Sequence, residues 1–277
     1  MDNPHRVERG IIAKKANQFM SLKSSLLKHL EFSIAMADIQ VEPVTSPKDF
    51  TEAFACIAAA FGRQTRDGFW IAMNPGWETP AGEAAGIKRL VDSWSSVTRN
   101  RDGDLNTVFL KATLPDSDGR RVIGGFAIWQ QCSVVEGYGD PQPEDVSKVM
   151  DLETLYPGDE AEQRYLVQLD SSLHGRRIEV IKEKAIASPP AVMVLDLCVV
   201  DPAHQRKGIA QRLVQWGLDE AKRRGGLEAI TEASSMGRKA YIKMGFYPDG
   251  DETVYHVDPE FKDRDLPSNL FMRTGRQ

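Results

Sequence analysis

The sequence predicts an α/β fold, in which helices flank a mixed and twisted central sheet. The first observation is the run 192–200, which is almost entirely apolar and rich in β-branched residues, as in a buried strand. The second is an amphipathic helix from Ala210, with apolar residues at i, i+3, i+4, i+7, i+8 and i+11. The third is another strand and helix between Leu227 and Gly245, with Ser234–Ser235 as candidate helix caps. We expect the two strands to run parallel and to splay apart into a crevice.

The other elements are predicted from shorter patterns. A turn rich in Pro, Asp, Ser and Gly joins two apolar segments, which predicts an antiparallel hairpin. Gly124–Gly125, inside the second of these segments, predicts a bend or a bulge. The expected elements are a strand at 39–41, a helix from Ser46–Pro47 to Phe61, the hairpin strands 107–113 and 122–130, and strands at 246–247, 253–257 and 270–273.

Composition indicates a globular protein and argues against several functions. The 277 residues are 41% hydrophobic, which is enough for a sizeable core. The formal net charge is −5, so the chain has no general attraction to nucleic acid, although it suits an amine substrate. The three cysteines form no CxxC pair, which predicts a reduced, cytoplasmic protein without a disulfide framework or a zinc site. No apolar stretch has the length of a membrane span.

Residues 1–36 are expected to form an N-terminal extension of a domain that covers 37–277. The extension is basic and carries an apolar helical stripe from Phe19 to Leu30, a combination also found in mitochondrial presequences. We interpret it as a peripheral helix or a disordered tail.

Gly208 lies in the loop between the strand 192–200 and the following helix, where it lets the backbone approach a ligand. The first turn of that helix presents unpaired N–H groups, which attract phosphate. The hexad Gln205–Ala210 resembles the pattern Gln/Arg-x-x-Gly-x-Gly/Ala of the GNAT superfamily, the acyl-CoA-dependent N-acyltransferases. Tyr241–Phe246 is similar to the Tyr-x-x-x-Gly-Phe that closes the family's next helix. The resemblance covers residues 192–246.

This resemblance implies a GNAT fold and acetyl-CoA as the co-substrate. The pantetheine arm is expected to pair with the backbone of Cys198 and Val200, and the pyrophosphate to bind at the loop. Ser234 stands where the family often has an asparagine that contacts pantetheine, and its side chain reaches less far. The expected cofactor-binding residues are Cys198, Val199, Val200, Gln205, Arg206, Lys207, Gly208, Ile209, Ala210, Gln211 and Ser234.

Amide formation needs one group that accepts a proton from the amine and another that protonates the departing thiolate. The resemblance assigns the acid to Tyr241, which alternatively only packs in the core. Asp196 is the first candidate for the base and Glu232 the second, although each alternatively orients water or pairs with an arginine such as Arg273. Strand alternation places Asp196 on the same side as Cys198. Cys198 has no histidine nearby in sequence and is expected to be a small apolar residue rather than a nucleophile.

Residues 131–190 exceed the short connection that a minimal family member needs at this place. Two helices, broken near Gly175, are expected to form a cap beside the substrate mouth. The acidic first half of this insertion either steers an amine or is a solvated face. Trp129 is expected to cover the core or, alternatively, to line the acceptor pocket.

The sequence therefore predicts an N-acetyltransferase that moves an acetyl group from acetyl-CoA to a primary amine of a small molecule, by direct transfer in a ternary complex. No metal, nucleic acid or membrane partner is expected. A protein lysine or N-terminal acetyltransferase is one alternative, and a GNAT-fold module that binds acyl-CoA without turnover is another. Tyr241 argues against the module, because a pure binder needs no acid near the sulfur.

Overall fold

The computed structural model describes residues 38–275. The chain divides into a unit 1–39 and a unit 40–277, and the sheet lies in the second unit. The N-terminal extension predicted at 1–36 lies outside the described residues. The strands are β1 (Gln40–Pro43), β2 (Thr107–Pro115), β3 (Arg121–Cys132), β4 (Val192–Val200), β5 (Glu228–Ser234), β6 (Tyr247–Glu252) and β7 (Asn269–Arg273).

Several helices begin where side chains cap them, as their sequences suggest. Asp67 Oδ1 accepts a hydrogen bond from the Trp70 N–H at the start of α3, and Thr79 Oγ1 accepts one from Gly82 at the start of α4. None of the described helices combines the length and apolarity that crossing a membrane requires. The helices are α2 (Asp49–Ile57), the π-helix η1 (Ala58–Thr65), α3 (Gly68–Met73), α4 (Pro80–Ser95), α5 (Leu152–Leu155), α6 (Glu160–Glu183), α7 (Ile209–Arg223) and α8 (Arg238–Lys243), with 3-10 turns η2 (Val146–Lys148), η3 (Lys184–Ile186), η4 (Pro202–His204) and η5 (Pro259–Phe261).

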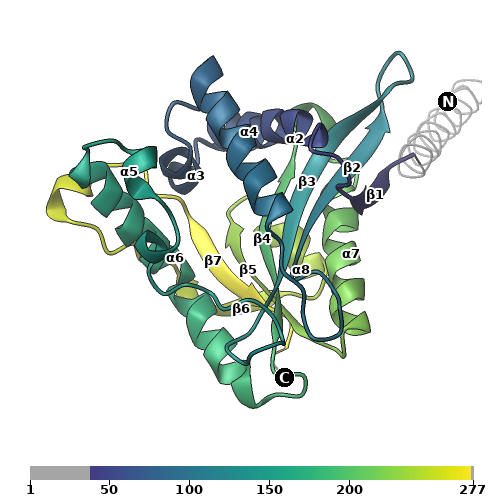
Figure 1. Ribbon diagram of the computed structural model, residues 1–277. Coiled ribbons are helices and arrows are strands. Elements are labelled where there is room, and N and C mark those ends of the chain that lie inside the picture. Colours follow the sequence, from purple (N-terminus) through teal and green to yellow (C-terminus); the bar gives the residue numbers. More distant parts are fainter. Residues whose placement is uncertain (1–37, 276–277) are drawn as a thin grey trace, which may run out of the picture. The chain divides into compact units, whose positions relative to one another are not determined.

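The strands form one mixed sheet in the order β1-β2-β3-β4-β5-β7-β6 (Figure 1). Neighbouring strands are antiparallel except for β4 and β5, which are parallel. The parallel pairing covers only Val192–Val194 with Glu228–Ile230, and the two strands part beyond it. The predicted α/β fold, with its mixed sheet and its splayed parallel pair, is confirmed.

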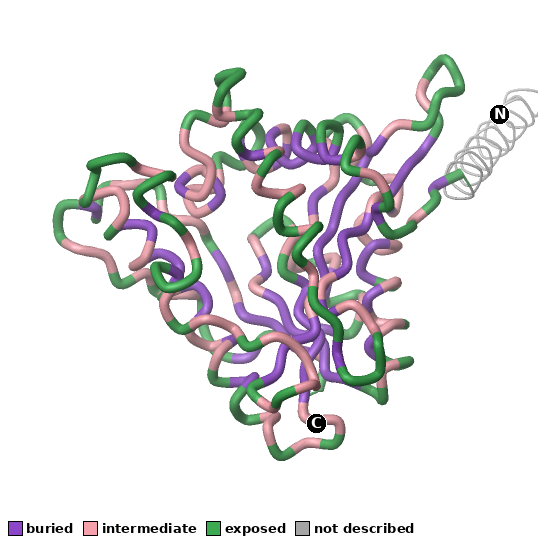
Figure 2. The backbone as a smooth tube through the Cα atoms, viewed as in Figure 1, coloured by how far each residue is buried: buried purple, intermediate pink, exposed green. Residues whose placement is uncertain are grey.

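Helices α2 and α7 cover opposite faces of the sheet. Phe126 and Ile128 of β3 share a buried cluster with α2, whereas Gly125 and Trp129 contact α7. Because successive strand residues point to opposite faces, the two helices lie on different sides. Helix α6 packs against β5 and β7 (Figure 1). Figure 2 shows that the central strands are buried along most of their length.

Two bulges interrupt the alternation of side chains. In β3, Gly124 is an extra residue opposite β2, as the glycine pair predicts. In β4, Asp196 is the extra residue, because Leu195 pairs with Trp129 and Leu197 with the next residue of β3, Ile128.

The β4 bulge corrects the expected orientation of Asp196. Asp196 contacts α6 through Arg177, whereas Cys198 pairs with Ala127 and meets Tyr241 of α8. The prediction that Asp196 and Cys198 share one side of the strand is wrong, because one extra residue reverses the alternation.

Three local predictions are also corrected. Helix α6 runs through Gly175 without a break, because buried residues on both sides outweigh the roughly 1 kcal/mol that a helical glycine costs. Segment 253–257 is a loop, in which Tyr255 donates to Asn269 and the exposed Val254 faces outward. Ser234 ends β5, and α8 begins after Gly237.

Candidate functional site

A cavity of about 410 Å³ lies where β4 and β5 part. Its walls come from α2, η1, α3 and α4, from the insertion helix α6, and from β4, β5 and α8. Aromatic surface combined with a few polar groups is typical of a site for a small ligand. The aromatic lining residues are Phe54, Phe61, Phe69, Trp70 and Tyr241, and the acidic and basic ones are Asp67, Arg89, Asp170, His174, Arg177, Asp196 and Glu232.

The end of β4 offers a free edge to this cavity. On one side, Cys198–Val200 pairs with Gly125–Ala127 of β3. On the other side, pairing with β5 stops at Val194, and Thr231 Oγ1 donates to the Leu195 carbonyl at 2.9 Å where the strands part. An extended ligand can pair with such an edge as an added strand.

The loop after β4 leads into a helix start that no side chain caps. Gly208 has φ +82° and Arg206 has φ +63°, both in the left-handed region, and α7 begins at Ile209. Gln205 Nε2 donates to the Val200 carbonyl at 3.3 Å and to Gln64 Oε1 at 2.7 Å, which fixes the loop against η1. The N–H groups of the first turn of α7 therefore remain available to an anion. The predicted residues Gln205, Arg206, Lys207, Gly208, Ile209, Ala210 and Gln211 all lie in this loop and first turn.

Tyr241 and Cys198 meet across the crevice. The Tyr241 ring lies 5.8 Å from the Phe246 ring, and its hydroxyl hydrogen-bonds the Cys198 thiol. Burial, together with Cys198, raises the pKa of Tyr241 well above its ordinary value. Burial raises the pKa of Cys198 to about 12 despite the opposing hydrogen bond from Tyr241. Both groups therefore hold their protons at neutral pH. Ser234 lines the same cavity, and its Oγ also accepts from the Gly237 N–H at 3.3 Å.

Asp196 and Glu232 are brought together by Arg177, whose residue surface is only 1% exposed. Arg177 Nε donates to Glu232 Oε1 at 3.0 Å and Nη2 to Oε2, while Nη1 donates to Asp196 Oδ1 at 2.7 Å. Burial lowers the pKa of Arg177, but the two carboxylates outweigh it and keep the pKa raised. Arg273 pairs instead with Glu228 and Asp249.

The cavity also contains a histidine and aspartate pair that the sequence reasoning missed. His174 Nδ1 lies 2.9 Å from Asp170 Oδ1, and both residues are buried on α6. Asp170 and His174 are four residues apart and lie beside the apolar stripe Leu166, Leu169 and Leu173, so the sequence pattern could have indicated that they meet on one helix face. In the part of the chain that the structure describes, no three His, Cys, Asp or Glu side chains are grouped as a metal site requires.

Trp129 does not line the cavity. Its ring is fully buried, Gly217 of α7 lies directly against it, and its Nε1 donates to the Leu213 carbonyl at 3.1 Å. Trp129 is therefore a core residue, and the alternative role in an acceptor pocket is wrong.

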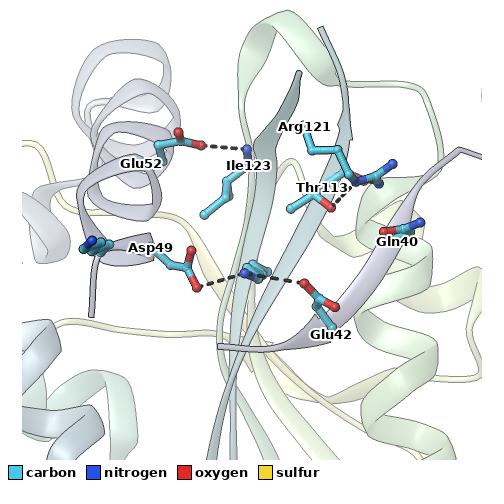
Figure 3. Close-up of a pocket in the computed structure, with 9 residues that line it drawn as sticks. Gln40, Glu42, Asp49, Glu52, Thr113, Arg121 and Ile123 are labelled. Atoms are coloured by element: carbon cyan, nitrogen blue, oxygen red, sulfur yellow. Dashed lines mark hydrogen bonds and ion pairs between the residues drawn. The ribbon is translucent and has the colours of Figure 1, made fainter. Parts of the chain in front are cut away.

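A second depression lies between α2 and the strands β1, β2 and β3 (Figure 3). Here Lys111 Nζ lies 2.9 Å from Asp49 and 3.4 Å from Glu42, and Glu52 accepts from the Ile123 N–H. Its charges largely pair with one another, and none of the predicted site residues line it. The candidate site is therefore the cavity between β4 and β5.

Comparison with known proteins supports this fold. Residues 136–246 match the acetyltransferase (GNAT) family. A mosquito arylalkylamine N-acetyltransferase-like 5b structure is 14% identical, with a TM-score of 0.54 over 85% of this chain and 98% of that one. An agmatine N-acetyltransferase is 14% identical, with a TM-score of 0.54 over 85% and 97%. The polyamine N-acetyltransferase of Drosophila melanogaster is 15% identical, with a TM-score of 0.53 over 85% and 97%.

No curated protein sequence matches the chain. The family match ends at Phe246, the last residue of the Tyr241–Phe246 motif, and includes the loop Gln205–Ala210. The resemblance drawn from these two motifs is confirmed, as is the GNAT fold.

Proposed function

Since residues 136–246 match the acetyltransferase (GNAT) family, we propose that this chain moves the acetyl group of acetyl-CoA to a primary amine of a small molecule. The observation that carries the proposal is the Tyr241 hydroxyl, which reaches Cys198 at the free edge of β4. Pantetheine paired along this edge brings its sulfur towards that hydroxyl, and the uncapped start of α7 receives the pyrophosphate. An acid placed at the leaving sulfur suits turnover rather than binding alone.

The reaction follows as a direct transfer. The amine must lose a proton, because an alkylammonium with a pKa of about 10.4 is not a nucleophile. Its nitrogen then forms a bond to the thioester carbon, the C–S bond breaks, and the electron pair stays on sulfur. Tyr241 donates its proton to this thiolate. Cys198 takes no covalent part, because its thiol is protonated at neutral pH.

The cavity suits a small cationic acceptor. Aromatic rings from α2, η1 and α3 line part of it. Four carboxylates and two guanidinium groups also line it, so acidic groups outnumber the arginines. The surplus of acidic groups attracts an alkylammonium, and aromatic faces contact its hydrocarbon or its charge. Solved proteins of this fold are named for arylalkylamine, agmatine and polyamine acceptors, which supports the same class here.

Thiol release from acetyl-CoA tests the proposal. Arylalkylamines, agmatine and polyamines form the first panel, a lysine peptide and a free N-terminal peptide form the second, and mass spectrometry identifies the product. We expect release that depends on a small amine and intersecting double-reciprocal plots, as in a ternary complex. Release with the peptides alone would favour a protein acetyltransferase. Calorimetric binding of CoA without release for any acceptor would favour a non-catalytic module and overturn the proposal.

A further inference from the structure

We propose that His174 is the general base of the transfer and that Asp170 orients its imidazole. This inference rests on the N-acetyltransferase function proposed above and supplies the group that takes the amine proton. As the amine nitrogen bonds to the thioester carbon, its proton passes to His174 Nε2. The departing thiolate takes the proton of Tyr241, and exchange with solvent restores both side chains.

The contacts of His174 prepare it for this role. The side chains of His174 and Asp170 are only 10% and 11% exposed, and both line the cavity. An ionised carboxylate only accepts hydrogen bonds, so the 2.9 Å contact places the hydrogen on Nδ1 and leaves the lone pair on Nε2. The ring also stands edge-on to Phe69, with centroids 5.6 Å apart and planes at 89°. These contacts fix both the tautomer and the orientation of the ring.

His174 lines the same cavity as the free end of β4. Arg177 follows it by three residues on the same face of α6, a rise of about 4.5 Å along the axis. Arg177 donates to Asp196 at 2.7 Å. Asp196 lies two residues before Cys198 in β4, and Cys198 is the residue that Tyr241 contacts. The proposed base and the proposed acid therefore enter one cavity from different elements, α6 and α8.

The two carboxylates that the sequence offered as bases are engaged elsewhere. Asp196 and Glu232 together accept three hydrogen bonds from Arg177. Protonating either one weakens the pairing of a buried guanidinium, which is costly. The imidazole of His174, in contrast, offers the Nε2 lone pair and is not bonded to Arg177. His174 thus provides the proton acceptor without disturbing the salt bridge.

The test is the pH dependence of kcat/KM for an amine found active in the thiol assay. We expect kcat/KM of the wild type to fall towards acidic pH, because an imidazolium has no lone pair left to accept the amine proton. His174→Gln should lower kcat by about 100-fold or more, remove this acidic limb, and leave the KM for acetyl-CoA unchanged. Asp170→Asn should lower kcat less and shift the limb. Besides Asp170, the titratable and charged groups that line the same cavity are Asp67, Arg89, Arg177, Asp196, Cys198, Glu232 and Tyr241.

Two matched variants make the result decisive. His256 is exposed and outside the cavity, so His256→Gln should leave kcat and the pH profile unchanged. Asp196→Asn should keep the acidic limb. If His174→Gln retains kcat within about twofold or keeps the limb, or if Asp196→Asn removes it, the inference is overturned while the transferase function stands. Absence of turnover by the wild type with every amine overturns the function and the inference together.

Discussion

Arg177 and Glu232 form a two-point salt bridge inside the protein, in which Nε donates to Oε1 at 3.0 Å and Nη2 donates to Oε2. The remaining nitrogen of the guanidinium donates to Asp196 at 2.7 Å. Glu232 lies on β5 and Asp196 on β4, so one side chain from α6 bridges the two strands after their own pairing has ended. The insertion helix is therefore a structural part of the crevice.

Removal of this bridge should destabilise the fold. Arg177→Met leaves Glu232 buried without its partner, and we expect the free energy of unfolding to fall by about 3–5 kcal/mol in urea denaturation. Lys88 forms an exposed pair with Asp92, so Lys88→Met should cost less than about 1 kcal/mol. Equal losses in the two variants would show that the buried bridge has no special structural role.

Tyr241→Phe keeps the buried ring and removes the proposed acid. We expect kcat to fall by about 10²- to 10⁴-fold, with the KM for acetyl-CoA and the melting temperature little changed. Because burial raises the pKa of Tyr241 well above its ordinary value of 10.0, the hydroxyl stays protonated through pH 9 and produces no loss of rate on the alkaline side up to that pH. If this variant had the same kcat as the wild type, Tyr241 would not be the acid of the mechanism.

Gly208→Ala should weaken acetyl-CoA binding. At φ +82° an added Cβ costs about 1–2 kcal/mol, and the loop must change shape where the pyrophosphate is proposed to bind. We expect the KM for acetyl-CoA to rise by roughly tenfold and the KM for the amine to stay constant. Gly119 has φ +77° in the β2–β3 turn with open space around it, so Gly119→Ala is the matched control. A similar change in both variants would refute the role of the loop.

Local patterns predicted much of the fold. The strand 192–200, the helix after Gly208 and the stop at Gly245 each depend on residues near in sequence, and the structure has them there. The bulge at Asp196 was not predictable in this way, because it arises from the register of β4 against β3. Gly175 predicted a break that the packing of α6 overrides.

The site was predicted only in part. Tyr241, Asp196 and Glu232 line one cavity, as expected of residues near the splayed strands. Arg177, however, lies 55 residues from Glu232 in the chain, and no local pattern connects them. The sequence predicts helices in the insertion, but the contact between Asp170 and His174 depends on both residues lying on the buried face of α6, which the expected break near Gly175 obscures.

Cys198 should be dispensable for the chemistry. Burial raises the pKa of its thiol to about 12, so almost none of it is thiolate at pH 7.5. We expect Cys198→Ala to keep kcat within about threefold and the wild type to react slowly with iodoacetamide at that pH. An acetylated Cys198 in mass spectra of enzyme mixed with acetyl-CoA alone would instead demonstrate a covalent intermediate.

Two helical glycines should respond to alanine in opposite directions. At Gly217, an added Cβ would lie 1.9 Å from the Trp129 ring, which is fully buried and cannot move aside. Gly217→Ala should therefore lower the free energy of unfolding by about 1–3 kcal/mol in urea denaturation. At Gly175, in the middle of α6, nothing lies within 4 Å of the added Cβ. Gly175→Ala should stabilise the protein by about 0.5–1 kcal/mol, because alanine favours the helix. If Gly217→Ala were neutral, Trp129 and α7 would not be packed as tightly as the structure shows.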